Sequence, residues 1–308
     1  MLPDKLKKTI GIKVDVDTHM GMQKGVPVLM EIFRAFNIKA SFFIPMGPDN
    51  TGRTVKRIWT RRGFLKKAGR VNVLQTYGIK TFLYGILLKG PEIAREGSHI
   101  IKKLIAEGHE VGIHGYDHVY WHDRIKYLDK LKTEEILDAS VKVFTEITGK
   151  DPVSFAAPGW MINEYALNFF QKNGFVYSSD TRGEIPFYPV MGKNRFSVIQ
   201  IPSTLPTLDE VIGIEGNDPN TLVRYFLGLL KDDLNILTIH AELEGNRWGA
   251  FLELFLKNAM KKGFKFKRLI DIAYILRDEG RLPFCEIIYG TIRGRAGEVS
   301  CHSPPIVS

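Results

Sequence analysis

Two aspartates and two histidines have the residue types and spacing of a metal-dependent active site. Asp15 and Asp17 lie two positions apart at the end of an alternating apolar run, so both side chains leave a strand on the same face. His114 and His118 follow a second strand-like run as a His-x-x-x-His pair. One carboxylate and two imidazoles can bind a divalent cation and leave positions open for substrate, which suits catalysis better than structure. The alternatives are a strand-end turn for the aspartates and a surface turn with two solvated histidines.

Further polar residues follow other strand-like runs. His240 ends the apolar run 236–239, where it could serve as a general acid. Asp180 follows another run and could orient this histidine by accepting its second ring proton. A structural histidine and a turn or N-cap aspartate are the alternatives. Asp117 is expected in a turn or in support of a ligand. Since each group follows a separate strand, we expect them to meet at the carboxyl edge of a parallel sheet, where such folds place their active sites.

Strand patterns alternate with helix patterns along the chain, which indicates a parallel α/β fold, either doubly wound or closed as a barrel. No repeat or Pro/Ser-rich linker divides it, so we expect one domain over residues 1–290 and a flexible tail over 291–308. The predicted strands are 10–16, 40–44, 110–114, 153–157, 175–179, 197–201 and 236–240. The predicted helices are 27–36, 92–107, 133–148, 164–173, 221–230, 248–261 and 269–277.

Composition excludes several protein classes. With 44% hydrophobic and 25% charged residues, the 308-residue chain is not disordered, collagenous or a coiled coil. Two cysteines, Cys285 and Cys301, are too few for a disulfide framework. The longest apolar run, about 81–88, is far shorter than the 18 or more residues of a spanning helix. We therefore expect a soluble, cytoplasmic protein.

The net charge of +9 is concentrated in one segment. Residues 51–91 contain ten basic and no acidic residues, whereas the rest of the chain has 33 basic and 34 acidic residues. Trp59, Phe64 and several leucines lie between the cations, a pattern typical of segments at an anionic membrane surface. A solvated basic surface is the alternative. Nucleic acid is not expected, because no recognisable reading module accompanies the charge.

Taken in order, these motifs resemble those of the polysaccharide deacetylase family, whose members have a NodB-type deformed (β/α) barrel. The acidic pair resembles the family's first motif, the His-x-x-x-His pair its second and the strand ending in His240 its fifth, while Asp180 has the position of the fourth. The resemblance implies this α/β barrel, here with a basic, membrane-facing insertion at about 53–90. It also implies hydrolysis of an amide on an amino sugar.

Several segments resemble one branch of the family more closely, the deformylases of 4-deoxy-4-formamido-L-arabinose phosphoundecaprenol. The branch removes formate from a lipid-linked amino sugar during lipid A modification. Its implied partners are an undecaprenyl-phosphate-linked amino sugar and the anionic inner face of the plasma membrane, where the basic segment would grip the phosphate. The similar segments are 47–53, 179–183, 201–210 and 238–245.

The resemblance also implies roles for single residues. Asp17, His114 and His118 would hold a divalent metal, expected to be zinc, with cobalt or manganese as alternatives. Asp15 would take a proton from water, and His240 would protonate the leaving amine. Trp160, Tyr116, Arg53 and Asn50 are the substrate-binding candidates.

One departure from the family pattern concerns the arginine that normally pairs with the catalytic aspartate. The run Phe155–Trp160 has no arginine, and we expect Arg182 to take its place.

Three other functions stay open from the sequence. A deacetylase of another N-acyl amino sugar or polysaccharide would use the same motifs, because motifs fix the reaction better than the substrate. A nucleotide-sugar transferase could use the Asp-x-Asp pair alone, although it would leave the three histidines unexplained. The third is a non-catalytic, membrane-associated sugar-binding domain. The sequence leaves the oligomeric state open.

Overall fold

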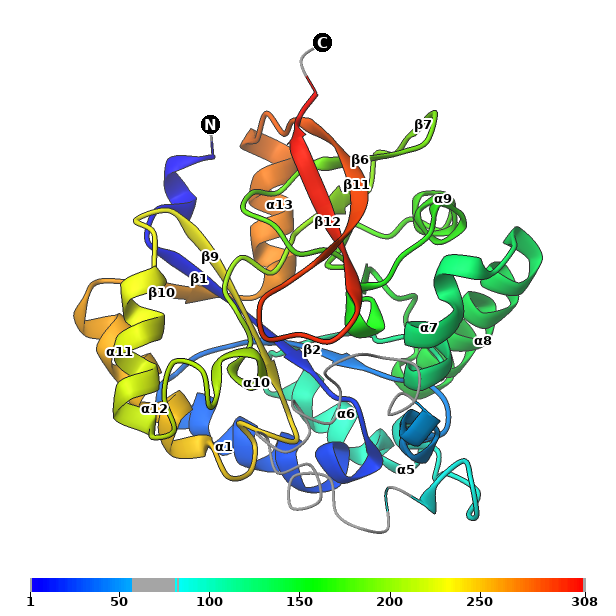
Figure 1. Cartoon of the computed structure of the whole chain (residues 1–308), viewed down its shortest axis with the longest axis horizontal. Helices are drawn as coiled ribbons and strands as arrows, with labels where there is room; N and C mark the ends of the chain where they lie inside the picture. The colour runs from blue at the N-terminus through cyan, green and yellow to red at the C-terminus, as the bar shows by residue number, and fades with distance from the viewer. Residues whose placement is uncertain (1, 57–80, 82, 307–308) are drawn as a thin grey trace.

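A curved sheet of parallel strands forms the centre of the computed structural model, which describes residues 2–56, 81 and 83–306 (Figure 1). The strands run side by side in the order β9–β1–β2–β3–β4–β5–β8, and the short β10 pairs with the first half of β1. Their bounds are β1 Thr9–Asp15, β2 Ser41–Ile44, β3 Glu110–Ile113, β4 Ser154–Phe155, β5 Tyr177–Ser178, β8 Ile199–Gln200, β9 Leu234–His240 and β10 Lys265–Lys267.

Hydrogen bonds close the curved sheet into an irregular barrel where β8 and β9 do not pair as strands. The backbone N–H groups of Thr204 and Leu205 both donate to the carbonyl oxygen of Ile236, at 3.2 Å. The hydroxyls of Ser203 and Thr238 are 2.6 Å apart across the same gap. The predicted deformed (β/α) barrel is therefore confirmed.

The alternation of β1 divides the core in two. Ile10, Ile12 and Val14 are buried between the sheet and the surrounding helices. Gly11 and Lys13 face the barrel interior, where a Cβ on Gly11 would lie 2.7 Å from the side chain of Ile236. β1 is hydrogen-bonded along both edges and covered on both faces, and all seven of its residues are buried.

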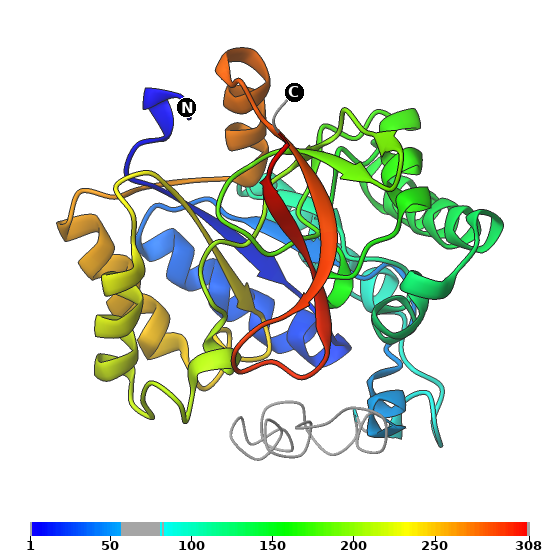
Figure 2. The ribbon, with the colours of Figure 1, turned by 45° about the horizontal axis from the view of Figure 1, so that its top comes forward.

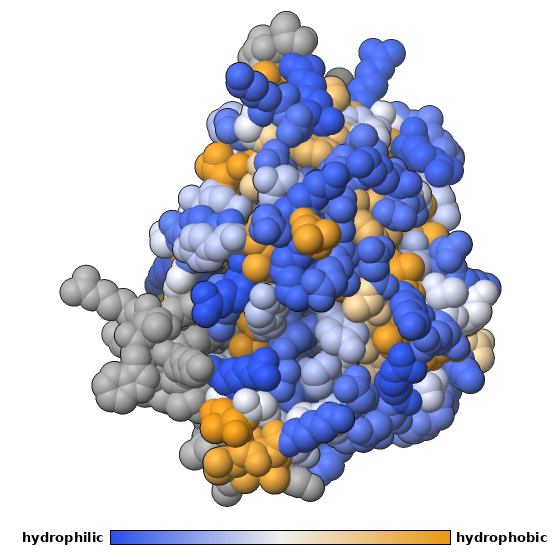
Figure 3. All heavy atoms as spheres, turned by 90° about the vertical axis from the view of Figure 1, so that its right-hand side faces the viewer, coloured by the Kyte–Doolittle hydropathy of each residue, from blue (hydrophilic) through white to orange (hydrophobic). Residues whose placement is uncertain are grey.

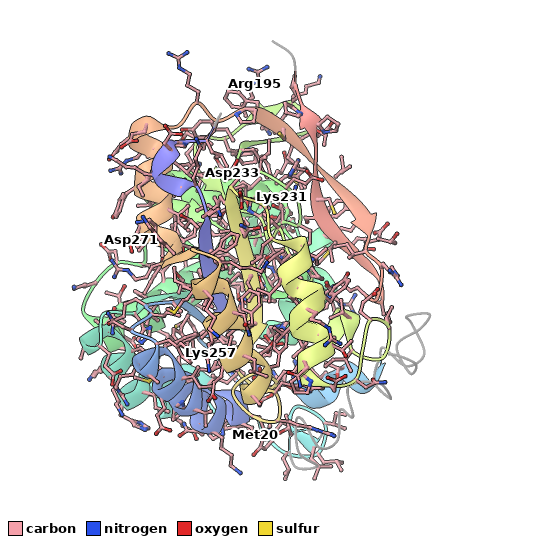
Figure 4. The ribbon with its side chains drawn as sticks, turned by 90° about the vertical axis from the view of Figure 1, so that its left-hand side faces the viewer. Met20, Arg195, Lys231, Asp233, Lys257 and Asp271 are labelled. Atoms are coloured by element: carbon pink, nitrogen blue, oxygen red, sulfur yellow. The ribbon has the colours of Figure 1, made fainter. Side chains whose placement is uncertain are left out.

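Helices cover the outside of the sheet. α11 and α12 pack against each other outside β9, as Figure 4 shows from that side with Lys257 of α12 labelled. The bounds are α1 Val26–Ala35, α5 Ile93–Glu96, α6 Ser98–Ala106, α7 His118–Arg124, α8 Lys130–Thr148, α9 Glu164–Lys172, α10 Leu208–Val211, α11 Pro219–Leu229, α12 Gly249–Lys261 and α13 Leu269–Glu279. Among the described helices, none has the length and hydropathy needed to cross a bilayer.

Two sequence predictions about helices need correction. The helix expected over 92–107 is broken at Gly97 into α5 and α6, and a Cβ at Gly97 would lie 2.6 Å from the side chain of Met22. A π-helical turn, Gly21–Gly25, precedes α1 and lengthens the helix predicted from residue 27.

The C-terminal segment forms a second sheet, so the prediction of a flexible tail over 291–308 is wrong for most of its length. β11 (Phe284–Thr291) and β12 (Glu298–Pro305) form an antiparallel hairpin, and β11 pairs in parallel with β6 (Tyr188–Met191). β7 (Asn194–Arg195) completes this sheet. Small residues and prolines suggested disorder, but the strand-to-strand pairing supplies the missing stability. The turn of the hairpin lies beside α10, near the ends of β1 and β9 (Figures 1 and 2).

Candidate metal-dependent active site

The predicted polar groups meet at the carboxyl edge of the barrel sheet. β1 and β9 pair with Asp15 directly opposite His240, and the N–H of Ala241 donates to the carbonyl oxygen of Asp15 at 3.0 Å. β3 ends at Ile113, so that His114 follows at the same edge. The prediction that groups from separate strands converge is confirmed for these residues, because parallel neighbours end together.

Asp17, His114 and His118 form the candidate metal site. The Nε2 atoms of His114 and His118 lie 3.4 and 3.3 Å from the same oxygen, Oδ1 of Asp17. Ligands that bind zinc tetrahedrally at about 2.0–2.2 Å are roughly 3.3–3.6 Å apart, so this spacing fits one cation. The three groups form the metal-ligating cluster found among the described residues, with ligand atoms within 4.8 Å of one another.

Neighbouring groups prepare these ligands for a cation. Nδ1 of His114 lies 2.7 Å from the carbonyl oxygen of Ala156, which fixes the proton on Nδ1 and leaves Nε2 able to bind a metal. Burial acts to raise the pKa of Asp17, but the charge of His118 and the hydrogen bonds of both histidines hold it well below its usual range. The Asp17 carboxylate is therefore anionic, as a cation ligand must be.

A buried glutamate that the sequence analysis missed holds the loop that carries Asp17. Oε1 of Glu242 accepts hydrogen bonds from the N–H of Asp17, at 3.0 Å, and from the N–H and hydroxyl of Thr18, at 2.8 and 2.7 Å. Burial and the nearby charge of Asp17 raise the pKa of Glu242 to about 8. Gly21 is required here, because a Cβ would lie 1.9 Å from Oε1. The signal was present in the sequence as an acidic residue two positions after His240.

Lys13 is the cation beside Asp15, and the expectation that Arg182 has this place is wrong. Nζ of Lys13 lies 3.3 Å from Oδ2 of Asp15 and donates to the carbonyl oxygen of Ser179 at 3.1 Å. The side chains of this pair are 0% and 4% exposed. Burial lowers the pKa of Lys13, and Asp15 opposes that effect. Lys13 and Asp15 lie on the same face of β1, two positions apart, so the spacing that predicted Asp15 and Asp17 on one face could also have identified Lys13.

Arg182 instead pairs with the fully buried Glu210, at 2.7 Å from Nη1 to Oε1. Its Nη2 donates to the carbonyl oxygen of Leu205 at 3.0 Å. The ion pair of Arg182 is thus with Glu210, whereas that of Asp15 is with Lys13.

Asp209, rather than Asp180, is the carboxylate beside His240. Its Oδ1 lies 4.0 Å from Nδ1 of His240, whereas Asp180 accepts a hydrogen bond from Nε2 of Gln200 at 2.8 Å. Burial raises the pKa of Asp180 to about 6. Burial acts to lower the pKa of His240, but Asp17, Asp209 and other carboxylates outweigh it and raise that pKa. A protonated His240 is what a general acid requires.

The four predicted substrate-binding residues differ in their surroundings. Asn50 Nδ2 donates to Asp117 Oδ2 at 2.7 Å, and Arg53 Nη1 lies 3.3 Å from the same oxygen. Both therefore support Asp117, whose other oxygen caps α7 by accepting from the N–H of Tyr120. Asp117 has the turn role predicted for it.

The two aromatic candidates are packed rather than open. Tyr116 is half-buried against Gly47. Trp160 is only 2% exposed and donates from Nε1 to the hydroxyl of Ser203 at 3.0 Å.

The chain is similar to known proteins over most of its length. It is 36% identical over 292 residues to a probable 4-deoxy-4-formamido-L-arabinose-phosphoundecaprenol deformylase of Shewanella sediminis, covering 94% of this chain and 93% of that protein. A protein of the same name from Wigglesworthia glossinidia brevipalpis is 37% identical over 287 residues, which cover 91% and 98% of the two chains.

A family profile and a solved structure agree with this similarity. The polysaccharide deacetylase profile matches residues 67–178. The crystal structure of a putative polysaccharide deacetylase from Mycobacterium smegmatis has a TM-score of 0.63 at 20% identity, with 91% of this chain and 93% of that chain covered. At that identity the structure supports the fold alone.

Proposed function

Because this chain belongs to the polysaccharide deacetylase family, we propose that it hydrolyses the formamide of a lipid-linked amino sugar, 4-deoxy-4-formamido-L-arabinose phosphoundecaprenol. The observation that carries the proposal is the similarity to two such deformylases over more than nine-tenths of the chain. In this reaction water adds to the formyl carbon, the C–N bond breaks, and formate and the free amine leave. A metal-dependent amide hydrolysis of this kind needs a cation site, a base and an acid, and the carboxyl edge of the barrel offers all three.

Separate residues of the site would bind the metal, accept a proton from water and donate a proton to the leaving amine. Asp17, His114 and His118 would hold a zinc ion, which polarises the formyl oxygen and makes water more acidic when bound. Asp15 takes the proton of the attacking water, and Lys13 holds its carboxylate in place. His240 donates a proton to the nitrogen as the C–N bond breaks, because an unprotonated amine is a poor leaving group. The carboxylate of Asp209 lies 4.0 Å from Nδ1 of this histidine, and its charge favours the protonated ring.

The basic insertion would place the barrel mouth on an anionic membrane. Most of its cations lie outside the described residues, but its last part ends in three consecutive exposed apolar side chains, Ile86, Leu87 and Leu88, which are 52%, 76% and 42% exposed. Figure 3 shows an orange, apolar cluster at the lower edge of the face that it draws. Next to them, Arg53 and Lys89 help to line a cavity of about 400 Å³. Apolar tips beside cations suit the interface of an anionic bilayer.

This insertion is connected to the active site. Arg53 bridges Gly85, at the base of the apolar tip, to Asp117, the residue before the metal ligand His118. A chain that docks at residues 86–88 would therefore hold the site close to the membrane surface, where the cytoplasmic face presents a lipid-linked substrate.

Release of formate tests the proposal directly. Wild type, Asp15→Ala and His114→Ala are compared on the lipid-linked formamido sugar, its acetamido analogue and a soluble N-acetyl amino sugar, each with and without added zinc, cobalt or manganese. We expect formate from the lipid-linked formamido sugar alone, with loss in both variants. Acetate from a soluble sugar would replace the deformylase with a deacetylase. Metal binding without turnover of any substrate would favour the sugar-binding alternative.

A further inference from the structure

Two consecutive residues at the start of the basic insertion contact both loops that carry candidate metal ligands. Asp49 and Asn50 follow β2 and precede the 3-10 turn Thr51–Lys56. They are buried, at 1% and 8% exposed. Neither belongs to the metal-ligating cluster itself. This pair, the Asp49–Asn50 clamp, therefore lies outside the ligands and next to the loops that hold them.

Asp49 completes the support of the loop that carries Asp17. Its Oδ2 accepts a hydrogen bond from the N–H of His19 at 2.9 Å. Oε1 of Glu242 holds the two preceding N–H groups, those of Asp17 and Thr18, at 3.0 and 2.8 Å. Two buried carboxylates thus bind three consecutive N–H groups, which fixes the backbone of this loop at the ligand.

One other contact ties the same loop to the flank of the insertion, and it is the weaker one. Nε2 of His19 lies 3.0 Å from Oε2 of Glu96 in α5, but the two side chains are 24% and 51% exposed. Ion pairs open to water contribute little to stability. The buried carboxylate of Asp49 is therefore the main link on this side.

Asn50 supports the second ligand loop through Asp117. Its Nδ2 donates to Oδ2 of Asp117 at 2.7 Å, and Oδ1 of Asp117 accepts from the N–H of Tyr120 at 2.9 Å. Asp117 is the N-cap of α7, whose first residue is the ligand His118. The amide of Asn50 therefore holds the start of the helix that carries His118. Arg53 assists from 3.3 Å, with a side chain that is 46% exposed.

Backbone contacts fix the clamp itself. The N–H of Asp49 donates to the carbonyl oxygen of Pro91 at 2.9 Å, and the N–H of Gly47 donates to that of Tyr116 at 2.8 Å. Gly90 passes so close that a Cβ would lie 1.9 Å from the carbonyl oxygen of Asp49. Both ends of the insertion thus meet at the clamp, beside the ligand loops.

We propose that Asp49 and Asn50 are positioning residues that set the separation of Asp17 and His118, and through it the affinity of the site for its metal. The spacing that they hold is the 3.3 Å between Oδ1 of Asp17 and Nε2 of His118. Residues that support metal ligands in this way typically change metal affinity by about 10- to 100-fold. The inference rests on the metal site of the proposed function and gives Asn50 a role in that site rather than in substrate binding.

Cobalt binding by the full-length, metal-free protein tests this inference without a substrate. The dissociation constant and the visible spectrum of bound Co²⁺, which reports its coordination geometry, are measured for wild type, Asp49→Ala, Asp49→Asn and Asn50→Ala. We expect each alanine variant to bind Co²⁺ at least about tenfold more weakly, with an altered spectrum. Asp49→Asn should recover part of the affinity, because its amide oxygen can still accept from one N–H group.

The double variant Asp49→Ala/Asn50→Ala tests whether the two residues act together. If both side chains fix the same separation, its loss of affinity should be smaller than the product of the two single losses. Single losses that multiply would show two independent supports and overturn the shared clamp.

Glu110→Gln is the matched control for the loss of a buried acid. Glu110 accepts hydrogen bonds from Ser154 and Tyr177 at the other end of β3 from His114. This variant should lower Tm and keep the wild-type affinity and spectrum. Wild-type Co²⁺ binding in both alanine variants would reject the proposal, as would losses that follow Tm equally in Glu110→Gln and the clamp variants.

Formate release separates this inference from the proposed function. Weaker Co²⁺ binding in the clamp variants, with no formate released by wild type, would keep the clamp and reject the deformylase. Formate release by wild type, with unchanged Co²⁺ binding in the clamp variants, would keep the deformylase and reject the clamp.

Discussion

Lys13 and Asp15 form a buried ion pair on one face of β1, and this pair holds the carboxylate of the proposed base in position. Removing one partner of such a pair leaves the other charge buried and unbalanced, which costs about 3–5 kcal/mol in comparable proteins. We therefore predict that Lys13→Met lowers kcat/KM by at least about tenfold, because Asp15 loses the cation that holds its carboxylate. Steady-state formate release measures the effect.

Two comparisons identify the cause of that loss. Lys13→Arg keeps the positive charge and should retain more of the rate than Lys13→Met. After loading with zinc, the metal content should stay near one per chain in both variants, since Lys13 pairs with Asp15 and is not a member of the Asp17–His114–His118 cluster. Full activity in Lys13→Met would contradict the assigned role.

The carboxylate that orients His240 can be identified by a pair of matched substitutions. Asp209→Asn removes the charge 4.0 Å from Nδ1 of His240, so we predict a fall in kcat of about 10- to 100-fold. Asp180→Asn keeps an oxygen that can accept from Gln200 and should have a clearly smaller effect. The two rates, measured at saturating substrate, decide between them. A larger loss in Asp180→Asn would restore the role expected from the sequence.

At the scale of elements, the sequence predicted those helices and strands whose position depends on neighbouring residues in the chain. The two-residue period predicted β1, and the stop signals at Gly149 and Gly174 predicted where α8 and α9 end. Asp15, Asp17 and His240 lie together at the carboxyl edge of the sheet, as the sequence predicted. The hairpin β11–β12 was missed because its small residues and prolines resemble a loop, and because β11 also pairs with β6, about a hundred residues earlier in the chain. No local pattern reports such a contact.

Contacts between residues distant in the chain also explain why the predicted partners of Asp15 and His240 were wrong. Arg182 and Glu210 are separated by 28 residues, and the pair depends on how the chain after β8 turns toward β9. Lys13 could have been found from its spacing alone, because the alternation of a strand is local. Asp209 could not, since its approach to His240 depends on the position of α10.

The apolar tip of the insertion offers a test of membrane docking. Leu87 is 76% exposed, and its transfer into the interface would be favourable by about 1.5–3 kcal/mol. We predict that Leu87→Ser lowers binding to vesicles that contain anionic lipid by about tenfold, as measured by cosedimentation. Leu131→Ser on α8 is the matched control, because Leu131 is 77% exposed on an element outside the insertion. Equal binding by both variants and wild type would exclude docking through this tip.

At the scale of the whole molecule, folding stability should depend on the protonation of a buried histidine at the opposite end of β3 from the metal ligand His114. His109 lies between α6 and β3, is 4% exposed and contacts the rings of Phe33 and Phe42. Its Nδ1 accepts from the N–H of Ala40 at 3.2 Å, which requires a neutral ring nitrogen. Burial, together with the charge of Lys39, lowers the pKa of His109 to about 4. The folded protein therefore disfavours the protonated histidine.

The sign of the pH effect follows from this lowered pKa. Between about pH 6.5 and pH 4 the unfolded chain binds a proton at His109 that the folded protein does not, so stability falls as the pH falls. The contribution is complete above about pH 6.5 and is of the order of 3 kcal/mol. We predict that His109→Gln, whose amide oxygen can replace the acceptor for Ala40, flattens the decline in Tm over this range relative to wild type. Differential scanning calorimetry at half-unit steps measures both curves. Parallel curves would show that the acid sensitivity arises from other groups, such as the carboxylates around the metal ligands.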